Sequence, residues 1–309
     1  MIKSKIKTLI NQIQGGVLPA MATPILNGGQ AINPTATNQL VELLINAGVR
    51  GIFVGGTTGE GILLANDVRM ALHQQVKTVI NNRVPLLIHV GTNTTADTLT
   101  LARHAAELGA DAIVAVTPYY YGMADDALFE YYQTIAQAVP DIPLLGYDIP
   151  HMAVNGITPA LLARMAAEIP SFAGIKCSRT DAQIVRALID AGTPDTMLLA
   201  GNERIAAGLL ALGADGLISG FATAVPEPYV ALTKAFQYGD MPEVQRQQRL
   251  INQILDQLPS GIRIGAIKRV ISQRGIEVGT AVPPRAMPPE SWPGWTKIKQ
   301  LLDTSNIAA

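Results

Sequence analysis

The sequence has few of the features that mark exported, membrane-bound or nucleic-acid-binding proteins. Its single cysteine, Cys177, excludes an internal disulfide and is compatible with a reducing compartment. The formal net charge is −1, and no basic stripe interleaved with aromatic residues is present. No stretch approaches the roughly 20 apolar residues that span a bilayer, and the basic residues 1–10 lack the apolar core and cleavage site of a signal peptide. We therefore expect a cytoplasmic protein with no nucleic-acid or membrane partner.

Motifs for nucleotide, metal and glycosidase chemistry are also lacking. No G-x-G-x-x-G or G-x-x-x-x-G-K-[ST] follows a predicted strand. The histidines are scattered without the spacing of metal ligands: His73, His89, His104 and His151. Paired carboxylates are absent, because the predicted strand ends offer only Asp148 and, after the seventh strand, Glu203. The sequence therefore gives little support for a metal site or a nucleotide cofactor.

What the sequence does contain is a regular alternation of short apolar runs and longer amphipathic segments. Hydrophobic residues make up 48% of the 309 residues, which is enough for a sizeable core. Strands are predicted at 17–23, 51–54, 85–90, 112–117, 142–147, 172–176, 196–200 and 216–219. Helices are predicted at 35–47, 66–80, 95–108, 125–138, 158–168, 181–191 and 203–212. The strands are continuously apolar, as in a parallel sheet that is covered on both faces.

This count predicts an α/β fold, a (β/α)8 TIM barrel. A doubly wound sheet is the alternative, but it normally carries a nucleotide motif. After the last strand, segments 226–238, 242–258 and 261–274 look helical, and a proline-rich stretch at 282–289 leads to a last short helix that holds Trp292 and Trp295. Because no flexible linker separates these parts, we expect a barrel at 1–223 and a C-terminal helical extension at 224–309 packed on it.

Lys176 ends the sixth predicted strand and is the only lysine between Lys77 and Lys234. A lone ammonium group at the end of a buried strand is costly unless it is paired or used in chemistry. A free amine in such a place can attack a carbonyl and form a Schiff base. The neighbouring Cys177 is better explained as a packing residue, because no His/Asn arrangement accompanies it.

Other strand ends carry groups that could serve this lysine, since the strands of a barrel present their carboxyl ends to one active-site face. The second strand ends in Gly55-Gly-Thr-Thr-Gly-Glu60, where amides and hydroxyls could hold a carboxylate, although a glycine-rich turn is the alternative. The fourth ends in Thr117-Pro-Tyr-Tyr-Tyr121 and the fifth in Tyr147-Asp-Ile-Pro150. A positioned tyrosine hydroxyl can relay protons, although each tyrosine alone could simply be a packing residue. Asn202 and Glu203 are either aldehyde contacts or the first turn of a helix.

These motifs, in this order at these strand ends, resemble the dihydrodipicolinate synthase/N-acetylneuraminate lyase family over most of the chain. The resemblance implies a TIM barrel with class I aldolase chemistry. Lys176 would form the Schiff base with pyruvate or another 2-oxo acid, and Tyr147 would move protons. Thr57 would link Tyr147 to Tyr120, which would come from a neighbouring subunit.

The same resemblance implies the ligands and the assembly. The expected substrate-binding residues are Thr58, Gly56, Ile218, Asn202 and Glu203, with Thr58 holding the pyruvate carboxylate. The expected ligands are pyruvate or a 2-oxo acid and an aldehyde, and the expected assembly is a homotetramer formed as a dimer of dimers. No metal or organic cofactor is implied, because the imine is itself the electron sink.

Two departures from the family pattern concern the second substrate. Met152 stands where the synthase branch usually has an arginine that binds the aldehyde's carboxylate, and Asp148 stands where asparagine is common. Methionine cannot replace that charged contact. We therefore expect a carbon-carbon lyase that reversibly cleaves a 2-keto-3-deoxy sugar acid or a similar 4-hydroxy-2-oxo acid. The alternatives are the 4-hydroxy-tetrahydrodipicolinate synthase of lysine biosynthesis, with Arg179 or another residue replacing the arginine, and a non-catalytic ligand-binding relative.

Overall fold

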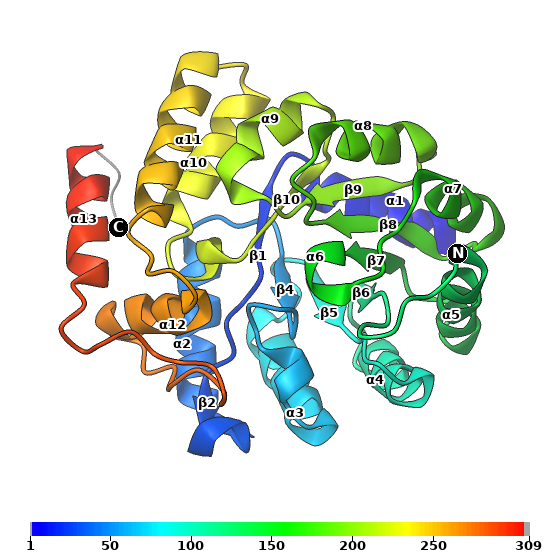
Figure 1. Cartoon of the computed structure of the whole chain (residues 1–309), viewed down its shortest axis with the longest axis horizontal. Coiled ribbons are helices and arrows are strands. Elements are labelled where there is room, and N and C mark those ends of the chain that lie inside the picture. Colours follow the sequence, from blue (N-terminus) through cyan, green and yellow to red (C-terminus); the bar gives the residue numbers. More distant parts are fainter. Residues whose placement is uncertain (1, 306–309) are drawn as a thin grey trace.

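The protein folds around a closed barrel of parallel strands, seen in a computed structural model that describes residues 2–305 (Figure 1). Within that range eight strands form one sheet in the order β1-β10-β9-β8-β7-β6-β5-β4. A parallel bridge between Ala20 and Phe53 joins the two end strands and closes the barrel. The barrel strands are β1 (Val17–Pro19), β4 (Ile52–Val54), β5 (Leu86–His89), β6 (Ala112–Val116), β7 (Leu144–Asp148), β8 (Phe172–Cys177), β9 (Met197–Ala200) and β10 (Gly216–Ser219). The predicted (β/α)8 barrel is confirmed.

Helices follow the strands and cover the outside of the barrel. They are α2 (Pro34–Asn46), α3 (Asn66–Ile80), α4 (Thr95–Glu107), α5 (Asp125–Ala138), α7 (Pro159–Glu168), α8 (Ala182–Ala191), α9 (Ala206–Ala211) and α10 (Glu227–Gln237). Side-chain caps define several starts: Asn33, Thr158 and Asp181 each accept a hydrogen bond from a backbone N–H in the first turn. The helix predicted at 203–212 instead begins as a 3₁₀ turn, η3 (Glu203–Ile205), because Ile205 leaves the helical conformation (φ −130°, ψ 28°) before α9.

Shorter elements complete the loops. They are the hairpin β2 (Ile25–Leu26) and β3 (Ala31–Ile32) with η1 (Asn27–Gly29) between them, η2 (Gly61–Leu63), α6 (Pro150–Ala153) and η4 (Phe221–Thr223). Three of them, η2, α6 and η4, follow barrel strands β4, β7 and β10 directly. They therefore lie at the barrel end where the carboxyl termini of the strands meet.

Successive side chains of the strands face opposite sides of the barrel wall. In β4, Ile52 and Val54 belong to the core between the sheet and the helices, whereas Phe53 belongs to the core inside the barrel. The N-terminal helix α1 (Ile2–Ile13) buries Ile6 and Leu9 in the inner core as well. That helix therefore closes the barrel at the end opposite to the loops that follow the strands.

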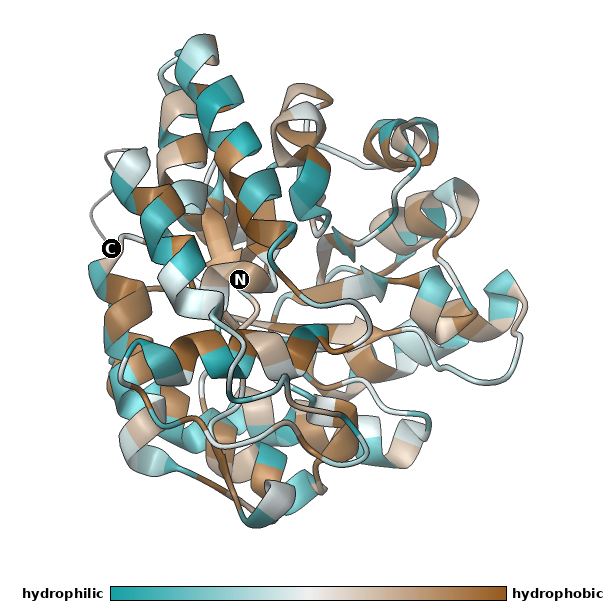
Figure 2. Cartoon of the chain, turned by 60° about the vertical axis from the view of Figure 1, so that its left-hand side comes forward, coloured by the Kyte–Doolittle hydropathy of each residue, from teal (hydrophilic) through white to brown (hydrophobic). Residues whose placement is uncertain are grey.

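Beyond α10 the C-terminal extension continues in α11 (Met241–Leu255), α12 (Arg263–Gln273) and α13 (Gly294–Thr304); α11 packs against α10, and α13 contacts both α11 and α12 (Figure 1). Figure 2 shows these helices with hydrophilic residues on their outer surfaces and hydrophobic residues turned inward. Trp292 precedes the last helix rather than lying in it, since Pro293 separates Trp292 from the first helical residue. The division at residue 223 stays a prediction. No helix among residues 2–305 is long and apolar enough to cross a membrane.

A buried ion pair ties this extension to the barrel. Nζ of Lys268 in α12 lies 2.7 Å from Oε2 of Glu60, and both side chains are fully buried. The Lys268 ammonium also donates to the Thr280 carbonyl at 2.8 Å, and the Val282 N–H donates to Oε1 of Glu60 at 2.9 Å. Glu60 has a positive φ of 57° at the end of the glycine-rich turn after β4. The extension therefore holds the turn that carries Thr57 and the residues beside it.

Candidate active site

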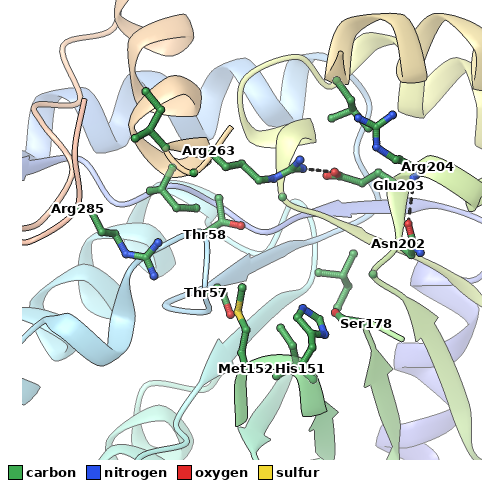
Figure 3. Close-up of a pocket in the computed structure, with 18 of the residues that line it drawn as sticks. Thr57, Thr58, His151, Met152, Ser178, Asn202, Glu203, Arg204, Arg263 and Arg285 are labelled. Carbon is green, nitrogen blue, oxygen red and sulfur yellow. Dashed lines mark hydrogen bonds and ion pairs between the residues drawn. The ribbon is translucent and has the colours of Figure 1, made fainter. Parts of the chain in front are cut away.

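A cavity of about 700 Å³ opens at the carboxyl ends of the strands (Figure 3). Its wall combines loops that follow the barrel strands with residues 261–265 and 284–286 of the C-terminal extension. Most of the predicted site residues line it: Thr57, Thr58, Tyr147, Lys176, Asn202, Glu203 and Ile218. Gly56 and Tyr120 do not. The cavity therefore brings together groups from distant parts of the chain, as the strand ends of a barrel do.

Lys176 projects into the barrel because β8 contains a bulge. The pairing of β7 with β8 shifts between Leu144/Leu145, so that Phe172 and Gly174 face consecutive residues. Gly174 has φ +135°, and a Cβ there would lie 1.9 Å from the Met197 carbonyl oxygen, so only glycine fits. The extra residue reverses the side-chain alternation. Lys176 thereby points inward, whereas Phe172 packs toward the helices.

The Lys176 amine lies between two aromatic rings at the base of the cavity. Its residue is only 4% exposed, and Nζ lies 4.0 Å from the ring centre of Tyr147 and 4.5 Å from that of Phe53. Tyr147 and Lys176 are direct neighbours in the pairing of β7 with β8. The amine makes no ion pair with any carboxylate in residues 2–305. It is therefore open to a carbonyl group that enters the cavity.

Tyr147 and Thr57 form the hydroxyl pair that the sequence predicts. Tyr147 Oη and Thr57 Oγ1 share a hydrogen bond of 3.1 Å. Phe53 packs edge-on against the buried Tyr147 ring, with ring centres 6.2 Å apart. Gly56 is a packing position, because a Cβ there would lie 2.4 Å from Cε1 of Phe53. Two hydroxyls in contact beside an amine can pass protons to and from a bound substrate.

Thr58 lies where two strand-end loops approach closely. Its hydroxyl faces Gly220, and a Cβ on Gly220 would lie only 2.7 Å from Thr58 Oγ1. Both residues line the cavity, as does Ile218 from the inner face of β10. The Thr58 hydroxyl therefore lies directly against the backbone of Gly220. Because Thr58 lines the cavity, a carboxylate bound there could accept a hydrogen bond from its hydroxyl.

Asp148 and Arg179 form a closed pair away from the cavity. Arg179 donates from Nε to Oδ2 of Asp148 at 2.6 Å and from Nη2 to Oδ1 at 3.1 Å. Asp148 is fully buried and also accepts from the Ile157 N–H at 2.9 Å. Neither residue lines the cavity. The negative charge of Asp148 is therefore neutralised by Arg179, and Arg179 is not free to replace the arginine missing at Met152.

The thiol of Cys177 belongs to the same buried region. Its sulfur lies 3.6 Å from Oδ2 of Asp148. Burial, with the negative charge of Asp148, raises the pKa of the Cys177 thiol to about 12. A thiol that stays protonated is a poor nucleophile. The structure therefore supports the interpretation of Cys177 as a packing residue.

Asn202 and Glu203 serve the local fold and line the cavity at the same time. Oδ1 of Asn202 accepts from the Arg204 N–H at 3.2 Å, which caps η3. Oε1 of Glu203 accepts from Oγ of Ser219 at 2.7 Å and from the Phe221 N–H at 2.6 Å. Glu203 thus fixes the loop after β10 against the loop after β9. The two alternatives weighed from the sequence, helix turn and substrate contact, are compatible in this arrangement.

Tyr120 lies outside the cavity of its own chain. It is 77% exposed, and its ring meets that of Tyr121 edge-on with centres 5.0 Å apart. Its φ of 84° is unusual for a bulky residue. Asn155 holds this conformation, since its Nδ2 donates to the Pro118 and Tyr121 carbonyls at 2.7 Å each and its Oδ1 accepts from the Met123 N–H at 2.8 Å. The loop therefore presents Tyr120 outward.

Buried basic residues lie behind Tyr147. The ring centres of His89 and Tyr147 are 6.0 Å apart, and Nη2 of Arg69 donates to the His89 carbonyl at 2.7 Å. Burial, followed by the charge of Arg69, holds the pKa of His89 and of His73 well below the usual histidine value. Both imidazoles are therefore neutral at pH 7. They support the wall behind the site without adding charge to it.

Several lining residues were not singled out from the sequence. Ser178 and Thr180 follow β8 and His151 follows β7, so the rule that identified Lys176 could have found them. Three arginines among the described residues also line the cavity: Arg204, Arg263 and Arg285 (Figure 3). Arg263 and Arg285 come from the C-terminal extension. No local pattern indicates that these segments return to the mouth of the barrel.

Comparison with known proteins identifies a family and several relatives that are similar to this chain in sequence. Residues 14–292 match the Dihydrodipicolinate synthetase family. An uncharacterized DapA-like lyase of Halobacterium salinarum is 33% identical over 264 residues, which cover 85% of this chain and 86% of the relative. A 4-hydroxy-tetrahydrodipicolinate synthase of Methanopyrus kandleri is 32% identical over 78% of this chain and 79% of its own. A probable 2-dehydro-3-deoxy-D-pentonate aldolase of Escherichia coli is also 32% identical, over 79% and 80%.

Solved structures agree with these relatives. The wild-type sialic acid aldolase of Ruminococcus gnavus superposes with a TM-score of 0.90 at 27% identity, covering 96% of this chain and 98% of that one. The YagE protein of Escherichia coli K12, of the dihydrodipicolinic acid synthase family and in complex with pyruvate, superposes with a TM-score of 0.85 at 28% identity, covering 95% and 99%.

Proposed function

The chain belongs to the dihydrodipicolinate synthetase family and is a lyase or aldolase of that family; we propose that it cleaves a 2-keto-3-deoxy sugar acid, or a similar 4-hydroxy-2-oxo acid, reversibly into pyruvate and an aldehyde. The supporting observation is the Lys176 amine at the base of the cavity, 4.0 Å from the ring centre of Tyr147, whose hydroxyl bonds to Thr57. The interpretation as a non-catalytic relative is dropped, because the family is one of enzymes.

The proposed cleavage uses the groups that line the cavity. The Lys176 amine attacks the C2 carbonyl, and loss of water gives the imine. Tyr147 takes the proton of the C4 hydroxyl as the C3–C4 bond breaks, so that the aldehyde leaves and the bonding electrons form the enamine. Protonation of C3 and hydrolysis of the imine then release pyruvate and restore the amine. Thr58 holds the C1 carboxylate throughout these steps.

The preference for a sugar acid over aspartate semialdehyde rests on the part of the cavity wall that contains Met152. Met152 is 60% exposed at the position where a carboxylate-binding arginine is expected in the synthase branch. Arg179 is bound to Asp148 and cannot take over that contact. A cavity of about 700 Å³ is far larger than pyruvate requires and accommodates a hydroxylated chain.

The synthase of lysine biosynthesis is the second candidate, because a relative of that name is as similar to this chain as the pentonate aldolase is. A panel of substrates distinguishes the two. Pyruvate release is followed from 2-keto-3-deoxy pentonates and hexonates, and pyruvate consumption is followed with aspartate semialdehyde. We expect turnover of the sugar acids. Turnover of aspartate semialdehyde alone would replace the first proposal by the second.

We also propose that the protein acts as a homotetramer, a dimer of dimers, in which Tyr120 enters the site of a neighbouring subunit. The support is the position of Tyr120, which is exposed and held outward by Asn155. Sedimentation or light scattering gives the assembly. Activity regained on mixing inactive Tyr120→Phe with inactive Lys176→Met subunits would support the exchange of residues between sites, whereas a fully active monomer would contradict it.

A further inference from the structure

The outer wall of the cavity is rich in positive charge, and most of that charge is neutralised by neighbouring carboxylates. Nη1 of Arg204 lies 2.9 Å from Oδ1 of Asp256. Arg263 forms an ion pair with Glu203. Both guanidinium groups therefore already have acidic partners from the protein itself. Arg285 is the lining arginine that remains.

Arg285 has no comparable partner in the described part of the chain. Its nearest carboxylate oxygen is Oε1 of Glu60, 3.9 Å from Nε, which is beyond hydrogen-bonding distance. Glu60 is already neutralised by Lys268 at 2.7 Å, and its Oε1 accepts from the Val282 N–H. The Arg285 side chain is 36% exposed, and Figure 3 shows its guanidinium group pointing into the cavity. The charge of Arg285 is thus directed at the space that a substrate fills.

The backbone holds Arg285 in this place. Its N–H donates to the Val282 carbonyl at 3.0 Å, which closes a turn through Pro283 and Pro284. Each proline ring fixes φ, so the turn has little conformational freedom. Val282 is itself anchored to the buried Glu60. A guanidinium group on a fixed turn can bind an anion with little loss of backbone entropy.

We propose that Arg285 binds an anionic group, a carboxylate or a phosphate, on the end of the substrate that becomes the aldehyde. This inference rests on the proposed function. The pyruvate end belongs at the buried base of the cavity, where Lys176 is 4% exposed, whereas Arg285 stands at the open rim. Carboxylates and phosphates are the groups that a guanidinium binds bidentately. Arg285 thus offers a cation at the rim of the same cavity, from a segment of the chain other than the one that carries Met152.

The test compares 4-hydroxy-2-oxo acids of equal length that end in a hydroxymethyl group, a carboxylate or a phosphate ester. The wild type, Arg285→Gln, Arg285→Lys and Arg50→Gln are assayed for pyruvate release. Arg50 is an exposed arginine two residues before β4, at the far end of the barrel, and serves as the matched control. The carboxylate and phosphate substrates show which anion is preferred.

We expect the wild type to cleave all three substrates and to have a higher kcat/KM for the two with an anionic end. Arg285→Gln should lower kcat/KM for these two substrates about 10- to 100-fold, mainly through KM, as expected for the loss of a charged hydrogen bond. The hydroxymethyl substrate should change less than about threefold, Arg285→Lys should recover part of the loss, and Arg50→Gln should match the wild type.

Two results would overturn the inference: a wild type that treats all three substrates alike, or an Arg285→Gln variant that loses the same factor on all three. Trapping of pyruvate on Lys176 with borohydride separates this failure from that of the proposed function. If Arg285→Gln still traps pyruvate, the imine chemistry stands and the role of Arg285 alone is rejected. If the wild type traps none, the proposed function is rejected as well.

Discussion

Replacing Lys268 by methionine should destabilise the contact between the C-terminal extension and the glycine-rich turn after β4 that carries Thr57. The side chains of Lys268 and Glu60 are fully buried, and their charged atoms lie 2.7 Å apart. Burial lowers the pKa of Lys268, and the carboxylate of Glu60 opposes this shift. In Lys268→Met the carboxylate stays buried without its counterion. Removing one partner of such a pair costs about 3–5 kcal/mol of unfolding free energy.

A double variant shows whether the loss of unfolding free energy in Lys268→Met comes from the unpaired charge of Glu60. Glu60→Gln together with Lys268→Met removes both charges and keeps an oxygen that can accept from the Val282 N–H. Replacing a whole buried pair is about neutral in free energy, so the double variant should recover most of the loss. Lys299→Met is the matched control, because Lys299 pairs with Asp303 on the surface of α13 and contributes below about 0.5 kcal/mol.

Urea unfolding followed by circular dichroism gives the four free energies. Because Glu60 ends the turn that carries Thr57 and Thr58, Lys268→Met should also raise KM for the 2-oxo acid. A Lys268→Met variant as stable as Lys299→Met would show that the unpaired Glu60 carboxylate costs nothing and that the buried pair does not stabilise the fold. A double variant less stable than Lys268→Met would exclude the unpaired charge as the cause of the loss.

Further predictions concern the site and its surroundings. Tyr147→Phe keeps the ring beside the amine but removes the proton relay, so kcat should fall about 10²- to 10⁴-fold; a fall below tenfold would exclude Tyr147 as the relay. Gly220→Ala places a methyl group 2.7 Å from the Thr58 hydroxyl and should raise KM for pyruvate while the melting temperature changes little; an unchanged KM would argue against a carboxylate there. Burial lowers the pKa of His73 and of His89 in the folded state, so the unfolded chain takes up more protons below the ordinary value of about 6.5. Each residue should therefore cost on the order of 1 kcal/mol of unfolding free energy as the pH falls from about 7 to about 5.5. Equal urea midpoints at both pH values would contradict this.

The fold could be predicted because the apolar runs of the sequence form the barrel strands and several helices begin at capping residues, such as Asn33 and Thr158. The helix predicted at 125–138 coincides with α5, and Asp181 caps α8 at the start of the helix predicted at 181–191. The deviation at Ile205 reflects a loop whose shape is set by the tertiary contacts of Glu203 with Ser219. Local sequence signals do not contain such contacts.

The site could be predicted in part, because strand ends in a barrel converge. That rule found Lys176, Tyr147 and Thr57, which the structure places around one cavity. It did not explain why Lys176 faces inward. Strict alternation would put Lys176 on the same side as Phe172, and the bulge that prevents this depends on the pairing with β7.

The sequence alone did not identify the residues that the C-terminal extension contributes to the cavity. Arg285 lies more than a hundred residues from Lys176 along the chain, in a proline-rich stretch that looks like a connection between helices. Its position follows from the burial of Glu60 against Lys268, a long-range ion pair. Asn155, which holds the Tyr120 loop, was missed because its contacts with Pro118 and Tyr121 also join segments that are distant in the sequence.

The central claim is that the Lys176 amine forms a Schiff base with pyruvate. The most direct measurement is reduction of the protein with borohydride in the presence of pyruvate, followed by peptide mass spectrometry, with Lys176→Met as the control. We expect one reduced adduct, on Lys176, that disappears in the variant. Absence of this adduct under conditions that trap a known class I aldolase, or its appearance on another lysine, would exclude Lys176 as the Schiff-base lysine.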